Sequence, residues 1–165
     1  MVDLGKTMLD GAILSAIASV FLAALLRFNP RLLLQDYPED IQHRVAPKTE
    51  QEKRQSLRVG IPFLILLGAV PFISTLALKR QGGAAASFPQ LFLNAFGVVF
   101  IFNLVDLLLL DWLMFCTLTP GFVVIPGTEG MEGYKDYGYH FRAFLTGTVF
   151  SIVAGLVIGG VVALL

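Results

Sequence analysis

Charged residues are scarce in this chain. Of its 165 residues, 12 are lysine or arginine and 12 are aspartate or glutamate, together 15% of the sequence. A soluble domain carries roughly 25% charged residues, and a compact chain of this size still has a large surface to solvate. Hydrophobic residues make up 56% of the sequence, and the mean hydropathy is +0.75. The composition argues against a soluble enzyme, a disordered tail or a nucleic-acid-binding module, and it predicts an integral membrane protein.

Cysteine is almost absent, since Cys116 is the only one. A single thiol forms no disulfide within the chain, which excludes a quinone-linked thiol oxidoreductase, and we expect Cys116 to be a small apolar packing residue. Histidine is also rare, and neither His43 nor His140 belongs to an HxxxH or HxxE pattern. Because zinc sites usually combine ligands at such spacings, the sequence predicts no metal site.

Four apolar segments are long enough to cross a membrane. A crossing helix needs about 20 mainly apolar residues at about 1.5 Å rise each. The segments run over about 7–26, 59–78, 91–115 and 143–165. Basic residues follow the first segment, and no clear positive cluster precedes it, so we expect a retained helix and not a cleaved signal peptide. The predicted fold class is therefore all-α: a polytopic bundle of four transmembrane helices that forms a single membrane domain over 1–165.

Lysine and arginine are concentrated in two of the connecting loops. Seven lie in the loop of about 27–58 and two in the loop of about 116–142, while the remaining three lie outside these loops. Short loops rich in lysine and arginine usually face the cytoplasm. The bias predicts that these two loops are cytoplasmic and that both termini lie outside, in a plasma membrane or a bacterial inner membrane. Membrane lipids are then expected partners, and nucleic acid is not.

The first cytoplasmic loop carries local helix signals. Pro38 followed by acidic residues predicts a short helix, and Thr49 with Glu52 forms a capping-box pattern that starts another. Glu50 and Arg54 are expected to pair at i and i+4. In the second loop, the apolar stretch 122–125 is too short to cross a membrane. It is either a short strand or a segment that covers the end of the bundle.

Small residues recur every four positions on two of the predicted helices. Such a stripe leaves a shallow groove in which another helix backbone can approach closely. The sequence leaves open whether the two stripes pack on each other or across a dimer. The residues of these stripes are Gly11, Ser15, Ser19 and Ala23 on the first helix and Gly147, Ser151, Gly155 and Gly159 on the fourth.

The third apolar segment carries an intramembrane polar site formed by Asn103, Asp106 and Asp111. An ionised carboxylate near mid-membrane costs roughly 2.5–3.5 kcal/mol on insertion scales. No lysine or arginine lies within the four predicted segments, so Asp106 must be protonated, reach water or meet an arginine from the cytoplasmic edge. Asn103 shares the face of Asp106. Asp111 lies about 140° further round an α-helix, so the two carboxylates are predicted not to share a face.

A second group of polar residues gathers in the two cytoplasmic loops. All four tyrosines and both histidines of the chain fall there, together with several acids. Tyrosine is common where a helix meets the membrane surface, so part of this group is expected to have no other role. The candidate residues are Asp36, Tyr37, His43, Glu129, Glu132, Tyr134, Asp136, Tyr137, His140 and Arg142.

Three functions are compatible with these features. The favoured one is an accessory or binding subunit in a homo-oligomer or with another membrane protein, which needs only packing stripes and a docking surface. A small proton- or cation-coupled transporter or channel would use Asp106 as its site. A membrane enzyme would act on a lipid head group at the cytoplasmic interface. The sequence contains no complete catalytic set and indicates no particular cofactor.

Overall fold

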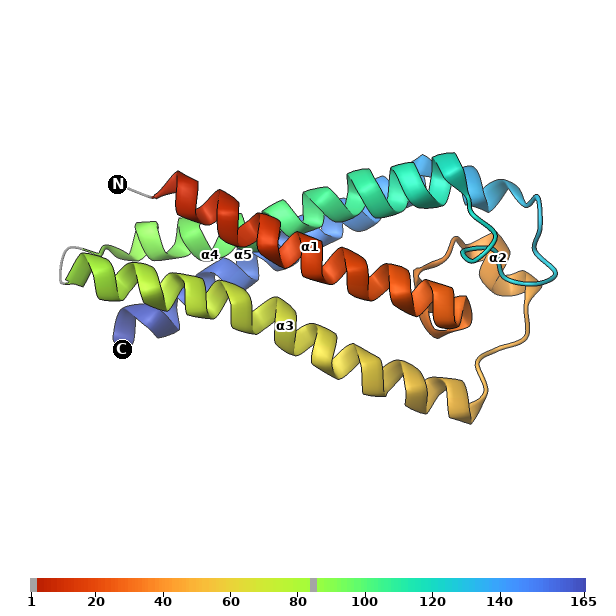
Figure 1. The fold of residues 1–165 in the computed structure, drawn as a ribbon, viewed down its shortest axis with the longest axis horizontal. Helices are drawn as coiled ribbons and strands as arrows, with labels where there is room; N and C mark the ends of the chain where they lie inside the picture. The colour runs from red at the N-terminus through yellow and green to blue at the C-terminus, as the bar shows by residue number, and fades with distance from the viewer. Residues whose placement is uncertain (1–2, 84–85) are drawn as a thin grey trace.

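The computed structural model describes residues 3–83 and 86–165, and within these ranges it contains helices and turns but no strand. Among these described residues, four helices are long and apolar enough to cross a membrane, and they lie along one another in an elongated bundle (Figure 1). They span Leu4–Phe28, Glu50–Gly82, Phe88–Leu118 and Tyr137–Leu164. The predicted all-α membrane bundle is confirmed.

Short helices connect the long ones. The elements in chain order are α1 (Leu4–Phe28), η1 (Pro30–Asp36), α2 (Glu39–Arg44), α3 (Glu50–Gly82), α4 (Phe88–Val105), η3 (Asp106–Leu118), η4 (Glu132–Lys135) and α5 (Tyr137–Leu164). The predicted short helix after Pro38 is α2. The predicted capping box starts α3, because Glu52 N–H donates to the Thr49 hydroxyl at 3.2 Å and Thr49 N–H donates to the Glu52 carboxylate at 2.7 Å. In that first turn Glu50 pairs with Lys53 at 2.8 Å instead of with Arg54.

The bundle has two different ends. The amino terminus, the carboxyl terminus and the facing ends of α3 and α4 lie at one end, which we call the terminal end (Figure 1). Residues 29–49 and 119–136 lie at the opposite end, which we call the loop end. Nine of the twelve lysines and arginines lie within 27–58 and 116–142, that is, in these two connections and in the helix turns that adjoin them.

Both small-residue stripes pack against α4 of the same chain. They therefore do not pack on each other, and their contacts do not require a dimer. A Cβ atom at Gly11 of α1 would lie 2.8 Å from Cβ of Ile101, and one at Gly155 of α5 would lie 2.8 Å from Cβ of Phe96. Real Cβ atoms do not approach so closely, so only glycine allows these contacts. The other stripe residues are buried or half-buried: Ser15, Ser19, Ala23, Gly147, Ser151 and Gly159.

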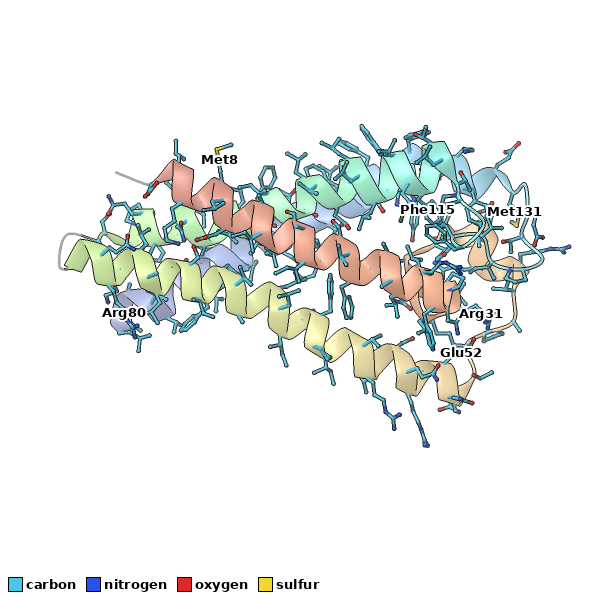
Figure 2. All side chains as sticks on the ribbon, in the orientation of Figure 1. Met8, Arg31, Glu52, Arg80, Phe115 and Met131 are labelled. Carbon is cyan, nitrogen blue, oxygen red and sulfur yellow. The ribbon has the colours of Figure 1, made fainter. Side chains whose placement is uncertain are left out.

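The loop end is a small apolar core, and not a solvated connector. The Tyr37 hydroxyl donates to the carbonyl of Val123 at 2.7 Å, and Ile125 N–H donates to the Tyr134 hydroxyl at 2.9 Å. Both tyrosine rings pack edge-on or tilted against Phe115. Figure 2 places Phe115 at this end of the bundle. The stretch 122–125 forms turns with buried side chains and no strand, so it covers the end of the bundle.

Polar contacts tie the first loop to α3. The Arg31 guanidinium lies 2.6 Å from the Glu52 carboxylate, and Figure 2 shows the two side chains close together at the loop end. The Lys48 ammonium donates to the carbonyl of Leu32 at 2.5 Å, and Ser56 donates to the same carbonyl at 2.8 Å. These contacts fix η1 beside the amino-terminal part of α3, where it forms one wall of the site described next.

Candidate functional site

The carboxyl-terminal part of the third membrane helix is wound as a π-helix. Residues 106–118 form η3, which continues directly from α4. Long π-helical stretches are rare, and π-helical turns occur frequently at functional sites. Because a π-helix closes its hydrogen bonds between i and i+5, residues five apart lie nearer to one face than in an α-helix. Asp106 and Asp111 accordingly line the same cavity. The prediction that they do not share a face is wrong, since it assumed α-helical geometry.

The cavity lies at the loop end and has a volume of about 540 Å³. Its walls come from α1, η1, α3, the end of α4, η3 and the start of α5. Three acids and a histidine line it, namely Asp36, Asp106, Asp111 and His140. Within the described part of the chain, no lysine or arginine lines this space. Most of the remaining wall is apolar: Phe21, Leu22, Leu25, Leu26, Leu32, Leu33, Val59, Phe63, Leu64, Phe102, Leu110, Met114 and Phe115.

Asp111 and His140 form a close pair across η3 and α5. The Nδ1 atom of His140 lies 3.0 Å from Oδ1 of Asp111. The imidazole is only 4% exposed and packs edge-on against Phe115, with ring centroids 4.9 Å apart. Its other nitrogen, Nε2, is buried and has no hydrogen-bond partner among the described residues. The pair is therefore satisfied on one side of the ring only.

Asp106 and Asn103 have different surroundings, although the sequence places them on one helix face. The Asn103 amide donates to the carbonyl of Phe144 at 3.1 Å and to the hydroxyl of Thr148 at 3.2 Å, so it fastens the third membrane helix to α5. Asp106 is half-buried, lines the cavity, and makes no ion pair or side-chain hydrogen bond with a described residue. Asn103 is thus a clamp between helices, whereas the Asp106 carboxyl is left available to the cavity.

Asp36 reaches the cavity from η1. The surrounding protein atoms raise the pKa of its carboxyl by desolvation, and the nearby Lys48 ammonium and Gln35 amide oppose that rise. Desolvation likewise lowers the pKa of Lys48, which is bonded to a backbone carbonyl and does not line the cavity. Burial also raises the pKa of the Tyr37 hydroxyl, which is already engaged with Val123.

The other predicted loop residues lie outside this cavity. Tyr134 belongs to the apolar core of the loop end. Asp136 caps α5 by accepting from Tyr139 N–H at 2.8 Å, and Arg142 lies 3.9 Å from Asp136. The rest are engaged locally or exposed: Glu129 accepts from Gly127 N–H, Tyr137 contacts the hydroxyl of Thr117, and His43 and Glu132 lie on the surface. The predicted polar cluster therefore divides, and only Asp36, Tyr37 and His140 line the cavity.

Among the described residues no three His, Cys, Asp or Glu side chains are grouped to hold a metal.

A second polar cluster, which the sequence analysis missed, lies toward the terminal end. The Lys6 ammonium contacts Asp10 and donates to the Ser74 hydroxyl at 3.1 Å. Asn94 accepts from the Thr7 hydroxyl at 2.7 Å and donates to the hydroxyls of Ser74 and Thr75, both at 3.0 Å. We call these six residues the terminal network. The i, i+4 spacing of Lys6 and Asp10 was the one sequence signal for it.

An apolar layer separates the terminal network from the cavity. Leu14 and Ala18 of α1 and Val98 of α4 form it, and they follow the network and precede the cavity along their helices. Phe102 packs with them and also lines the cavity.

Comparisons of this chain with family models, with curated proteins and with solved structures found no match. The chemistry of the cavity itself is clear: acidic groups in an apolar recess attract a cation, and the unpaired nitrogen of His140 can accept a hydrogen bond.

Proposed function

We propose that this small membrane protein is a binding protein whose cavity takes an amphiphilic cation. The observation that carries the proposal is that Asp36, Asp106 and Asp111 share a largely apolar cavity that no described lysine or arginine lines. Burying a carboxylate without a partner is costly, and an opposite charge at short range offsets that cost. A cationic head group would supply the missing charge.

The walls of the cavity support an amphiphile over a simple ion. Leu25 and Phe21 of α1 face the space together with Phe63 of α3, so an apolar chain or ring system has side chains to pack against. The volume of about 540 Å³ lies within the range of about 300–1,000 Å³ typical of small-molecule sites. A bare cation would leave these apolar walls without a contact.

The apolar layer favours binding over conduction. Leu14, Ala18 and Val98 lie between the cavity and the terminal network, Phe102 belongs to the cavity wall, and no hydrogen bond between described residues joins the polar groups of the two regions. A transporter that used Asp106 would have to open this layer, and a proton-flux assay in liposomes tests that alternative. An enzyme acting on a lipid phosphate is less well supported, because three acids would repel an anionic head group.

Ligands of matched chain length test the proposal. Thermal unfolding of the protein in a neutral detergent is measured with 1-dodecylammonium, 1-dodecanol or dodecanoate added. We expect the ammonium alone to raise the unfolding temperature, because a ligand that binds only the folded state stabilises it. The Asp106→Asn variant should lose most of this increase, whereas Glu132→Gln, an exposed acid of the second loop, should keep it. Equal increases with all three amphiphiles would contradict the proposal.

We further infer that the loop end faces the cytoplasm, and that both termini lie outside. The support is the concentration of lysine and arginine in the two loops at that end and in the helix turns that adjoin them. Single cysteines at Gln51 and Gln81, both exposed, are placed in a Cys116→Ser background and treated in intact cells with an impermeant maleimide. We expect labelling at Gln81→Cys only. Labelling at Gln51→Cys only would reverse the orientation. Association with a second copy or another membrane protein stays a prediction.

A further inference from the structure

In the Asp111–His140 pair, one nitrogen of the imidazole ring, Nε2, lacks a hydrogen-bond donor. With Nδ1 at 3.0 Å from a carboxylate oxygen, the proton of the neutral ring is favoured on Nδ1. Nε2 then carries a lone pair and is a hydrogen-bond acceptor. That atom is buried and unpaired, in a side chain that is 4% exposed. Buried polar atoms in folded proteins almost always have a partner, so an exception calls for an explanation.

No described side chain offers the missing donor. The ring of His140 is flanked by the rings of Phe115 and Tyr139, with centroids 4.9 Å and 5.4 Å away, and both are arranged edge-on. The ionisable neighbours that share the cavity, Asp36, Asp106 and Asp111, are acceptors when they are charged. A neutral ring at this position therefore needs a donor from outside the chain. His140 lines the cavity, but Nε2 itself has less than 1 Å² of exposed surface, so a ligand head group reaches this atom only after a neighbouring side chain moves.

We infer that the cavity selects a cationic head group that carries at least one N–H, and that Nε2 of His140 accepts that N–H. The inference rests on the proposed function and names the class of ligand within it: primary, secondary or tertiary ammonium, against quaternary ammonium. The acids of the cavity recognise the positive charge of the head group, which is present in ammonium ions with an N–H and in quaternary ammonium ions. Only a head group with an N–H satisfies Nε2 as well.

A series of dodecyl ammonium ions tests this inference on the unmodified protein. Affinities are measured for dodecylammonium, N,N-dimethyldodecylammonium and N,N,N-trimethyldodecylammonium at a mildly alkaline pH at which the first two remain protonated. We expect the first two to bind alike and the third to bind about tenfold more weakly, the factor that corresponds to 1.4 kcal/mol. A stepwise fall at the loss of the last N–H indicates the hydrogen bond. A gradual fall with each methyl group indicates size alone and would overturn the inference.

Two histidine variants provide the matched control. In His140→Asn the amide nitrogen can still face Asp111, but no acceptor remains at the position of Nε2. This variant should bind all three ions with similar affinity, near that of the trimethyl ion for the parent. His43→Asn changes the exposed histidine of α2 and should keep the parent's preference. The two failures are distinguishable: equal affinities in the parent refute the N–H preference only, whereas no binding of any ion refutes the proposed function and this inference together.

Discussion

The two polar regions of this bundle both contain aspartate, but their polar groups are satisfied to different degrees. In the terminal network, Asp10 has Lys6 and Ser74 as partners, and Asn94 makes three side-chain hydrogen bonds. In the loop-end cavity, Asp106 has no side-chain partner among the described residues, and His140 is paired at one nitrogen only. Both regions lie inside a largely apolar environment, in which an unpaired polar group is costly.

The difference indicates two different roles. A polar group whose partners are all present holds helices together, as Asn94 does for α1, α3 and α4. A polar group that lines a cavity and lacks a partner destabilises the empty protein and gains most when a ligand supplies that partner. We therefore propose that the terminal network is structural and that the cavity binds a ligand. Each of the following predictions tests that division.

The largest effect is expected from Asn94→Leu. The substitution removes three hydrogen bonds and leaves the hydroxyls of Thr7, Ser74 and Thr75 with fewer partners in a buried site. We expect the free energy of unfolding to fall by about 2–3 kcal/mol, measured by denaturation in detergent. Leu93→Ala, at a neighbouring exposed position, is the control and should change stability much less. An effect no larger than the control's would remove the structural role of the network.

A somewhat smaller loss is expected from Gly155→Leu, which tests the packing that supports both regions. The added side chain would press on Phe92 and Phe96 of α4, with a Cβ only 2.8 Å from that of Phe96. Both rings are half-buried and can move in part, so we expect a loss of about 2 kcal/mol. Val157→Leu, at a position that is 59% exposed, should be nearly neutral. Equal stability of the two variants would refute close packing of the α5 stripe on α4.

The smallest effect is expected from Asp36→Asn and depends on pH. Nearby protein atoms raise the pKa of the Asp36 carboxyl above its ordinary value, although the residue is partly exposed and the Lys48 ammonium opposes the rise. Between the ordinary and the raised pKa the folded state binds more protons than the unfolded state, so stability falls as pH rises through that window. The amide cannot titrate and should remove this fall. We expect the variant's unfolding temperature to exceed the parent's by less than about 3 °C above the window and to match it below. A difference that does not vary with pH would contradict the assignment.

Much of the architecture could be predicted from the sequence, because it follows from local properties. The apolar segments, the capping box at Thr49 and Glu52, and the short helix after Pro38 each depend on residues that are close in the chain. The stripes of small residues predicted close packing as well. They could not name the partner, since a groove on α1 or α5 does not encode which helix fills it.

The site was predicted only in part, for two physical reasons. The shared face of Asp106 and Asp111 depends on the π-helical winding of 106–118, which no propensity rule in the sequence indicates. The pairing of Asp111 with His140 joins two helices across the bundle, and the terminal network joins three. The residue type and its place in an apolar segment identified Asp106 as a candidate site residue. Only the structure shows that Asn103 connects two helices while Asp106 lines the cavity.

The most direct test compares two matched changes of carboxyl to amide, Asp10→Asn in the terminal network and Asp106→Asn in the cavity. For each variant the unfolding temperature is measured alone and with 1-dodecylammonium. Asp10→Asn should lower the temperature of the unliganded protein, because Lys6 loses its charged partner, and it should keep the ligand's stabilising effect. Asp106→Asn should leave the unliganded temperature unchanged or higher and should lose the ligand's effect. The opposite pattern, or the same response from both variants, would contradict the division between a structural network and a binding cavity.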